Sequence, residues 1–339
     1  MLCFTGDINL TDWYFNAGFG IGSRVAAGWN PFRHIERRNG DIWIGNFEGV
    51  ASSVSIHENG LQRDVFRVEP EVLKKINHFD IYGFANNHAM QHGDDAYRQT
   101  VKTLEIDGGG KVFGTETART HVFTHQNRQV SVTGMSLRID EFSENPLYWH
   151  NPEYSEIVQE LQNIPNGTYK ILFVHWGDEY IDYPSSAQKK FAHWLLDIGF
   201  DCIIGMHPHV LQGYEIYNGK RIYYSLGNFV FDMAGEPCKF GAVVKIDLST
   251  DMPVFKERYV LIEDSSPRII DEANVPHKYR FCTLNERLAK ECNLENYYND
   301  VRAGYAAYRK ANHAYIMGNM IKHPIAGIRM IDDFIKRRF

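Results

Sequence analysis

The sequence predicts an α/β protein in which helices cover a β-sheet, and three observations lead to this class. Apolar, β-branched runs alternate with amphipathic stretches over the first two hundred of the 339 residues, which is the pattern of a layered α/β fold. The dipeptide Asn218-Gly219 joins two further runs and is typical of a β-hairpin. After about residue 264 the strand pattern stops, so we expect helices there.

Strands and helices are expected in turn through the first two hundred residues. Pro70 favours the start of one helix, because proline is well accommodated in a first helical turn. Gly108-Gly109-Gly110 favours the end of another, and we interpret it as a turn. The expected strands are residues 2–5, 41–45, 79–85, 112–113, 121–124, 129–136, 169–174 and 201–205. The expected helices are residues 31–38, 71–77, 94–106, 153–163 and 185–198, the first of them after a loop rich in glycine and aromatic residues.

The remainder of the chain is expected to hold strands first and then helices. Residues 214–217 and 221–225 form the predicted hairpin, and residues 242–248 and 254–262 add two strands, which indicates a second sheet or an antiparallel extension. The expected helices cover residues 283–310 and 321–338, and His323-Pro324 interrupts the pattern, so a single long helix is not expected. We therefore predict a domain at residues 1–263 and a helical extension at residues 264–339.

The composition is that of an ordinary globular protein. Hydrophobic residues make up 44% of the chain and charged residues 23%, which suits one large domain with an appendage. The net charge of -6 argues against nucleic acid as the main partner.

The ends of the chain and its cysteines bear on the compartment. The five cysteines show no CxxC spacing, so we interpret them as reduced thiols and not as a disulfide framework. A strand pattern begins at the first residues, with no basic leader and no long apolar segment. We therefore expect a cytoplasmic protein without a signal peptide.

Polar side chains gather directly after the predicted strands. The apolar run Ile203-Ile204-Gly205 is followed by His207-Pro208-His209, and two histidines with this spacing can bind one metal ion or two adjacent ions. Carboxylate, amide and imidazole groups together suit divalent cations, and a shared carboxylate can bridge two of them. The other strand-end residues of this kind are Asp7, Glu48, Asn87, His88 and His175.

Each of these residues has a simpler explanation when it is taken alone. Asp7 can be a turn residue or a helix cap, and Glu48 can be a solvated turn carboxylate. His88 can be a histidine satisfied within its loop, and His175 can make a structural hydrogen bond at a buried strand end. Their recurrence at successive strand ends favours one shared site.

Longer motifs make the pattern specific. They are Phe4-Thr5-Gly6-Asp7, Asn46-Phe47-Glu48, Ala85-Asn86-Asn87-His88-Ala89-Met90, His175-Trp176-Gly177-Asp178-Glu179-Tyr180, Gly205-Met206-His207-Pro208-His209-Val210-Leu211-Gln212 and Tyr224-Ser225-Leu226-Gly227-Asn228-Phe229-Val230-Phe231-Asp232. In these segments the chain resembles the CapA family of bacterial capsule synthesis proteins, which are linked to poly-γ-glutamate and capsule production. The resemblance covers roughly residues 2–247.

That family is in turn similar to the calcineurin-like metallophosphoesterases, which implies a two-sheet αββα sandwich. The resemblance implies that one or two divalent ions (Mn, Fe, Zn or Mg) are bound. It implies that Glu48 takes the place of the bridging carboxylate and that His88 protonates the leaving group. The other implied metal ligands are Asp7, Asn87, His175, His207 and His209.

The chain departs from the patterns of these two families in three places. Asn9 stands where the pattern has a histidine, which weakens one of the two metal positions. The bridging aspartate is replaced by glutamate, and Met206 stands where CapA relatives often carry another histidine.

Two further residues are assigned with Asn9 to substrate binding or to support of the ligands. Glu179 can orient a ligand histidine, or it can be an exposed carboxylate. Asn228 can bind substrate oxygens, while the neighbouring Leu226-Gly227 can simply form a tight strand exit.

The function implied is that of a metal-dependent hydrolase in capsule or exopolymer biogenesis. A metal-bound hydroxide would attack a phosphoester or a polymer amide bond, so the expected substrate is an anionic polymer or a phosphoester. The alternative is a scaffold subunit of a polymer-synthesising or export complex, with a degenerate metal site. Metal binding distinguishes the two.

The tail from residue 308 to 339 mixes apolar and basic residues. Such a segment can lie on an anionic membrane surface or contact a synthase complex. The alternative is that its apolar residues pack back onto the domain. The apolar residues are Tyr315, Ile316, Met317, Met320 and Ile321, and the basic ones are Lys322, Arg329, Lys336, Arg337 and Arg338.

Overall fold

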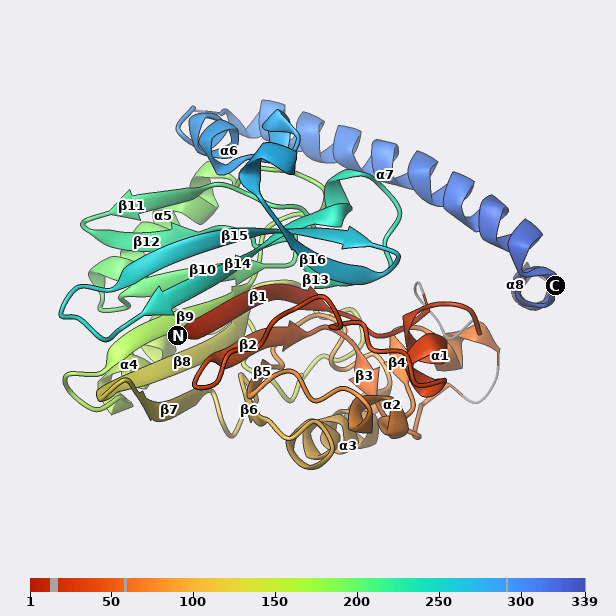
Figure 1. Cartoon of the computed structure of the whole chain (residues 1–339), viewed down its shortest axis with the longest axis horizontal. Helices are drawn as coiled ribbons and strands as arrows, with labels where there is room; N and C mark the ends of the chain where they lie inside the picture. The colour runs from red at the N-terminus through yellow and green to blue at the C-terminus, as the bar shows by residue number, and fades with distance from the viewer. Residues whose placement is uncertain (13–17, 58–59, 291, 339) are drawn as a thin grey trace.

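The computed structural model describes residues 1–12, 18–57, 60–290 and 292–338, so part of the expected aromatic loop lies outside the described residues. Two β-sheets lie face to face, and helices cover their outer faces (Figure 1). The predicted α/β class and αββα sandwich are therefore confirmed.

The first sheet combines a parallel half and an antiparallel half. Strands β1, β2, β5 and β6 run parallel, β14 to β16 run antiparallel, and β13 pairs with β1. The order across the sheet is β16 (Ser266–Ile270), β15 (Val254–Glu263), β14 (Phe240–Asp247), β1 (Leu2–Ile8), β2 (Ile42–Phe47), β5 (Ile81–Gly83) and β6 (Lys111–Phe113), with β13 at Asn228–Val230.

The second sheet has parallel strands at its centre and a hairpin at each edge. Its order is β11 (Tyr214–Tyr217), β12 (Lys220–Tyr223), β10 (Cys202–Met206), β9 (Tyr169–His175), β8 (Arg128–Ser136) and β7 (Thr120–His125). The predicted hairpin at Asn218-Gly219 joins β11 to β12. A separate short pair consists of β3 (Val50–Ala51) and β4 (Arg67–Val68).

Alternation along the strands builds the layers. In β9, Ile171 and Phe173 point into the core between the sheets, while Leu172 and Val174 pack under the helices of the second sheet. The outer helices of the first sheet are α1 (Ile21–Ala26), α2 (Pro70–Lys74) and α3 (Gly93–Ile106), and those of the second are α4 (Tyr154–Asn163) and α5 (Ser186–Asp197).

Three helices complete the chain: α6 (Phe281–Leu288), α7 (Leu294–Lys322) and α8 (Pro324–Arg338). Helix α7 runs past one edge of the sandwich and projects beyond it, carrying α8 at its far end (Figure 1). It ends at Lys322, so the predicted interruption at His323-Pro324 is confirmed. None of the helices in the described ranges is long and apolar enough to cross a membrane.

Several element predictions are wrong. The single helix expected at residues 283–310 is two helices, since α6 ends at Leu288 and α7 begins at Leu294. The helix expected at residues 31–38 is not formed: residues 31–34 make a turn and residues 35–38 belong to no element. The Pro31 carbonyl accepts a hydrogen bond from the Ser266 hydroxyl at 2.5 Å, and Ile35 N donates to Phe32 O, three residues back, instead of continuing a helix. No strand was expected after residue 264, yet β16 pairs along β15. The division into two units at residue 263 stays a prediction.

Candidate metal centre

The two sheets bring their strand ends together at one place. Asp7 lies near the end of β1, and Glu48 and Asn87 follow β2 and β5 in the first sheet. In the second sheet His175 ends β9 and His207 follows β10. The carboxyl ends of parallel strands share one edge. A hydrogen bond of 3.1 Å from His207 N to Asp7 Oδ2 joins the two edges.

One group of candidate ligands surrounds Nε2 of His175. This atom lies 2.8 Å from Asn87 Oδ1, 3.0 Å from His207 Nδ1 and 3.6 Å from Glu48 Oε1. With metal–ligand bonds of about 2.1 Å, neighbouring ligands of one ion stand about 3 Å apart. The spacing therefore suits a shared cation.

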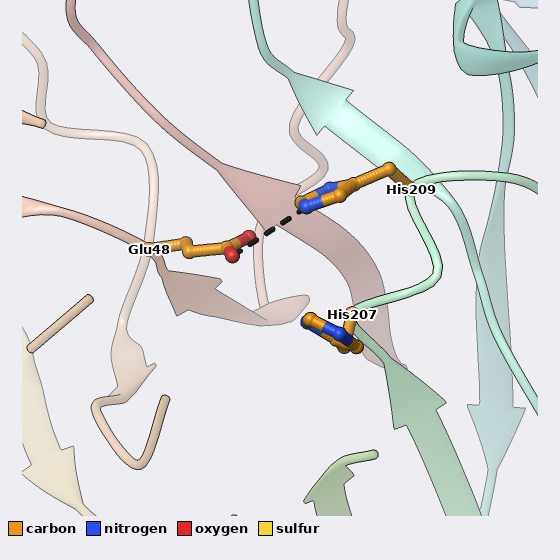
Figure 2. A group of neighbouring side chains, drawn as sticks. All are labelled: Glu48, His207 and His209. Carbon is orange, nitrogen blue, oxygen red and sulfur yellow. Dashed lines mark ion pairs between the residues drawn. The ribbon is translucent and has the colours of Figure 1, made fainter. Parts of the chain in front are cut away.

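A second group surrounds His209. Its Nε2 lies 3.6 Å from Glu48 Oε1, and its Nδ1 lies 3.6 Å from Asp7 Oδ2. Figure 2 shows the Glu48 carboxylate facing the His209 ring, with His207 beside them. Glu48 lies in both groups, and it is also common to the two sets of three residues whose ligand atoms lie within 4.8 Å of one another: Asp7, Glu48 and His175, and Glu48, His207 and His209. A bridging carboxylate would be shared in this way.

Burial sets the protonation of these groups. Burial raises the pKa of Glu48 well above its usual range, and the negative charges of Asp7 and Glu179 raise it further. Burial lowers the pKa values of His175 and His207 well below the usual value. The two rings are therefore neutral at pH 7, which is the form that binds metal.

Unpartnered polar atoms test whether this donor set fits a cation. Among the described residues, both carboxylate oxygens of Glu48 and Nε2 of His207 are buried without a hydrogen-bond partner. A buried polar atom without a partner costs free energy, and a cation would satisfy these atoms. Carboxylate, imidazole and amide ligands together suit a divalent cation.

His88 stands at the more open side of the site. Its side chain is 16% exposed, and its Nε2 lies 3.9 Å from Glu48 Oε1. The ring stacks on Phe66 at 3.7 Å, and Nδ1 contacts Gln91 Oε1 at 2.9 Å. Burial lowers the pKa of His88 to about 4, so His88 is neutral at pH 7 until an anionic group approaches it.

The three supporting residues lie around the ligands. Asn9 donates from Nδ2 to Glu48 O at 2.7 Å, while its Oδ1 accepts from the backbone of Thr11 at 2.8 Å. Asn228 Oδ1 lies 3.0 Å from His209 Nδ1. Glu179 acts on the site through its negative charge. This charge raises the pKa of Glu48, although burial raises it more.

Sequence reasoning missed several contributors. The Asn46 amide donates to Asp7 Oδ1 at 2.8 Å and contacts His175 Nδ1 at 3.3 Å. The Asn86 amide donates to Phe47 O at 2.8 Å and so fixes the loop before Asn87. Both residues lie in motif segments that the sequence already indicated. Their closeness in sequence to Glu48 and Asn87 could have identified them.

Backbone strain marks the same loops. His207 and His209 have φ angles of 97° and 58°, and Tyr180 has 62°. Non-glycine residues seldom adopt this region, and such strain concentrates at functional sites. Tyr180 N donates to Pro208 O at 2.9 Å, which ties the two strained loops together.

The residues that converge here lie within a match to a known family. The family model described as bacterial capsule synthesis protein PGA_cap matches residues 1–233. The chain belongs to this family. All candidate ligands and Asn228 fall inside the matched range, whereas helices α6 to α8 lie beyond it.

Curated relatives agree with the family. The chain is 28% identical over 286 residues to the PGA biosynthesis protein CapA of Bacillus subtilis (strain 168), covering 78% of this chain and 72% of the relative. It is 28% identical over 266 residues to the capsule biosynthesis protein CapA of Bacillus anthracis, covering 71% and 64%.

A solved structure of a hypothetical protein from Thermus thermophilus is similar over 76% of this chain and 98% of that chain. Its TM-score is 0.47 and its identity 13%. A likeness this low supports no conclusion about function.

Proposed function

We propose that this PGA_cap protein is a metal-dependent hydrolase of capsule or exopolymer biogenesis. The observation that carries the proposal is the Glu48 carboxylate, which is fully buried and has no hydrogen-bond partner among the described residues. Three histidines and Asp7 surround it. Isolated buried carboxylates are costly, and a bound cation is the simplest compensation.

The two ligand groups divide the work of holding cations. His175, His207 and Asn87 would hold one ion together with Glu48, and His209 would hold the other with the shared Glu48, while Asp7 lies beside both His175 and His209. When bound, such ions lower the pKa of water and polarise the scissile group. The protein's contribution is a buried site with neutral imidazoles already in place.

His88 would hold the proton for the leaving atom. It is the histidine of the site with partial exposure, so it lies where a substrate would enter. An anionic substrate would raise the pKa of His88 from its low value of about 4, because a nearby negative charge favours the imidazolium. The ring could then donate from Nε2.

The proposed substrate is an anionic polymer or a phosphoester. The names of the two Bacillus relatives refer to PGA and capsule biosynthesis, and the net charge of -6 disfavours nucleic acid. Both P–O and C–N cleavage are compatible with the arrangement.

One observation favours a second candidate function, that of a scaffold subunit with a degenerate metal site. Asn9 occupies the place of a ligand histidine, and its Oδ1 is already engaged by Thr11. The group around His209 therefore has fewer ligands than the group around His175. A chain that loses one cation in this way could retain only a structural role in a synthase complex.

Metal analysis followed by assay separates the two functions. Purified protein is analysed for bound Mn, Fe, Zn and Mg, and then assayed on a chromogenic phosphodiester and on poly-γ-glutamate. Bound metal with hydrolysis of either substrate supports the hydrolase. Absence of metal, or bound metal without hydrolysis of either substrate, favours the scaffold.

We also propose that the tail contacts an anionic membrane surface from the cytoplasm. Ile321 and Ile325 are 79% and 78% exposed, and Ile328 continues the exposed stripe. Lysine and arginine outnumber aspartate and glutamate in this segment, which favours anionic lipid. All five cysteines are free thiols, as a reducing compartment requires.

Vesicle sedimentation and cell fractionation test the tail. An Ile325→Asn, Ile328→Asn double variant is expected to lose binding to phosphatidylglycerol-containing vesicles, whereas Ile216→Asn on β11, also an exposed isoleucine, is expected to retain it. Equal binding to purely zwitterionic vesicles, or recovery of the chain as a secreted or integral membrane protein, would contradict the proposal.

A further inference from the structure

Arg138 stands at the same sheet edge as the candidate ligands, although no strand-end motif drew attention to it. Strand β8 pairs with β9 so that Ser136 lies opposite His175. Leu137 N then donates to His175 O at 2.9 Å. Arg138 therefore lies just after the end of β8, next to the end of β9 where His175 is placed.

Contacts on one side hold the Arg138 guanidinium. Nη1 donates to Gly177 O at 2.6 Å and to Asp178 Oδ1 at 3.3 Å. Among the described residues Nη1 is the one guanidinium nitrogen that makes hydrogen bonds, so Nη2 and Nε remain available, and the side chain is 30% exposed.

Helix α7 reaches this arginine through Asp178. The Tyr297 hydroxyl donates to Asp178 Oδ2 at 2.9 Å, so one carboxylate joins α7 to the guanidinium. Tyr297 is buried. The helix is fixed further along by Gly304, where an added Cβ would lie 2.4 Å from Tyr180 O, and by Tyr308, which stacks on the Tyr180 ring at 4.1 Å.

The charges around the site call for such a cation. Asp7 and Glu48 are carboxylates of the site, and Glu179 lies close enough to act on Glu48 through its charge. Together they would repel an anionic substrate unless cations offset them. An arginine fork binds phosphate or carboxylate oxygens through parallel N–H donors. The Nη2 and Nε donors of Arg138 are available, and the contacts of Nη1 hold the guanidinium in place. Arg138 is therefore suited to bind such an oxygen group.

We propose that Arg138 binds an anionic oxygen group of the substrate and that α7 positions it through Tyr297 and Asp178. This inference rests on the proposed hydrolase function and deepens it, because it assigns recognition of the substrate's negative charge. It also gives a helix beyond the family match a role at the site. Arg138 is the binding residue, and Tyr297 and Asp178 are positioning residues.

Anion binding to metal-loaded protein tests the proposal. Protein loaded with Mn²⁺ is titrated calorimetrically with inorganic phosphate and, separately, with glutarate as a carboxylate probe, after its metal content has been measured. The variants are Arg138→Gln, Arg138→Lys and Tyr297→Phe. Tyr298→Phe is the matched control, because no hydrogen bond to Asp178 involves Tyr298 among the described residues.

Arg138→Gln is expected to retain metal and to bind the preferred anion about 10- to 100-fold more weakly, the usual weight of a charged hydrogen bond. Arg138→Lys should recover part of this loss, and Tyr297→Phe should weaken binding about 2- to 10-fold. Tyr298→Phe should match the wild type. In assays, KM should rise more than kcat falls.

Unchanged anion affinity in a metal-loaded Arg138→Gln variant would overturn the inference and leave the hydrolase proposal intact. Equal effects of Tyr297→Phe and Tyr298→Phe would overturn the positioning role of α7. A wild-type chain that takes up no metal would overturn the proposed function and this inference with it.

Discussion

Nδ1 of His207 lies 3.0 Å from Nε2 of His175, and the two atoms come from neighbouring strands of the second sheet. Burial lowers the pKa of both rings, so electrostatic repulsion between two imidazolium ions does not arise at pH 7. Two neutral ring nitrogens aimed at the same space form half of a metal site before any metal arrives.

Replacing His207 with Ala is expected to remove metal and activity together. The change deletes one ligand of the group around His175. His175, Asn87 and Glu48 would then be too few ligands to hold the cation. Metal analysis of the purified variant is the measurement. His193→Ala on α5 is the control, because that histidine hydrogen bonds Glu215 instead of any candidate ligand.

Replacing His88 with Ala is expected to leave metal bound and to slow turnover about 10²- to 10⁴-fold, the usual contribution of a general acid. His88 makes no contact shorter than 3.9 Å with the Glu48 carboxylate, so its loss should not empty the site. Metal content and kcat are measured on the same preparation. Loss of metal as complete as in His207→Ala would show that His88 is a ligand.

Replacing Asn228 with Ala is expected to weaken metal binding about 10- to 100-fold. Loss of a partner that orients a ligand histidine usually lowers metal affinity by this factor. The variant removes the Oδ1 atom that lies 3.0 Å from His209 Nδ1. Asn228→Asp keeps an acceptor there and should retain more affinity. Competition with a metallochromic chelator measures both, and equal losses would argue against an orienting role.

Gly304 allows α7 to approach the site closely. An added Cβ would lie 2.4 Å from Tyr180 O, so Gly304→Ala is expected to destabilise the protein by about 1–3 kcal/mol through overpacking. Gly318→Ala, on the same helix, meets no atom within 4 Å and should stabilise it by about 0.5–1 kcal/mol. Urea unfolding checks both signs, and a neutral Gly304→Ala would mean that α7 does not pack tightly there.

Acid should destabilise the protein through His78. Burial, with the Arg37 charge, lowers the pKa of His78 to about 4, against about 6.5 in the unfolded chain. The unfolded state therefore takes up a proton first, and the stability that His78 contributes above pH 6.5 is lost as the pH falls towards 4.

The expected loss from His78 is about 2 kcal/mol between pH 7 and pH 5. The free energy of unfolding of wild type and His78→Phe is measured at both values. The variant keeps an aromatic ring against Phe32, on which His78 stacks at 4.5 Å, and should lose less stability on acidification. Identical losses in both proteins would contradict the assignment.

The sequence by itself determined the layered class and the candidate ligands. Period-two burial in strands such as β9 is a local property, and parallel strands deliver the residues after them to a common edge. Asp7, Glu48, Asn87, His175, His207 and His209 could therefore be expected at one place, although their roles as ligands stay predictions.

Only the tertiary structure decided how those residues are supported. Thr11 N donates to Asn9, Asn228 contacts His209, and Tyr297 reaches Arg138 through Asp178. The last link joins segments more than a hundred residues apart, and no local periodicity encodes such a partner. The turn in place of the helix expected at 31–38 was missed because the Pro31 carbonyl bonds to Ser266, a partner far away in the sequence. β16 was missed because its pairing with β15 supplies the stability that its own short sequence does not signal.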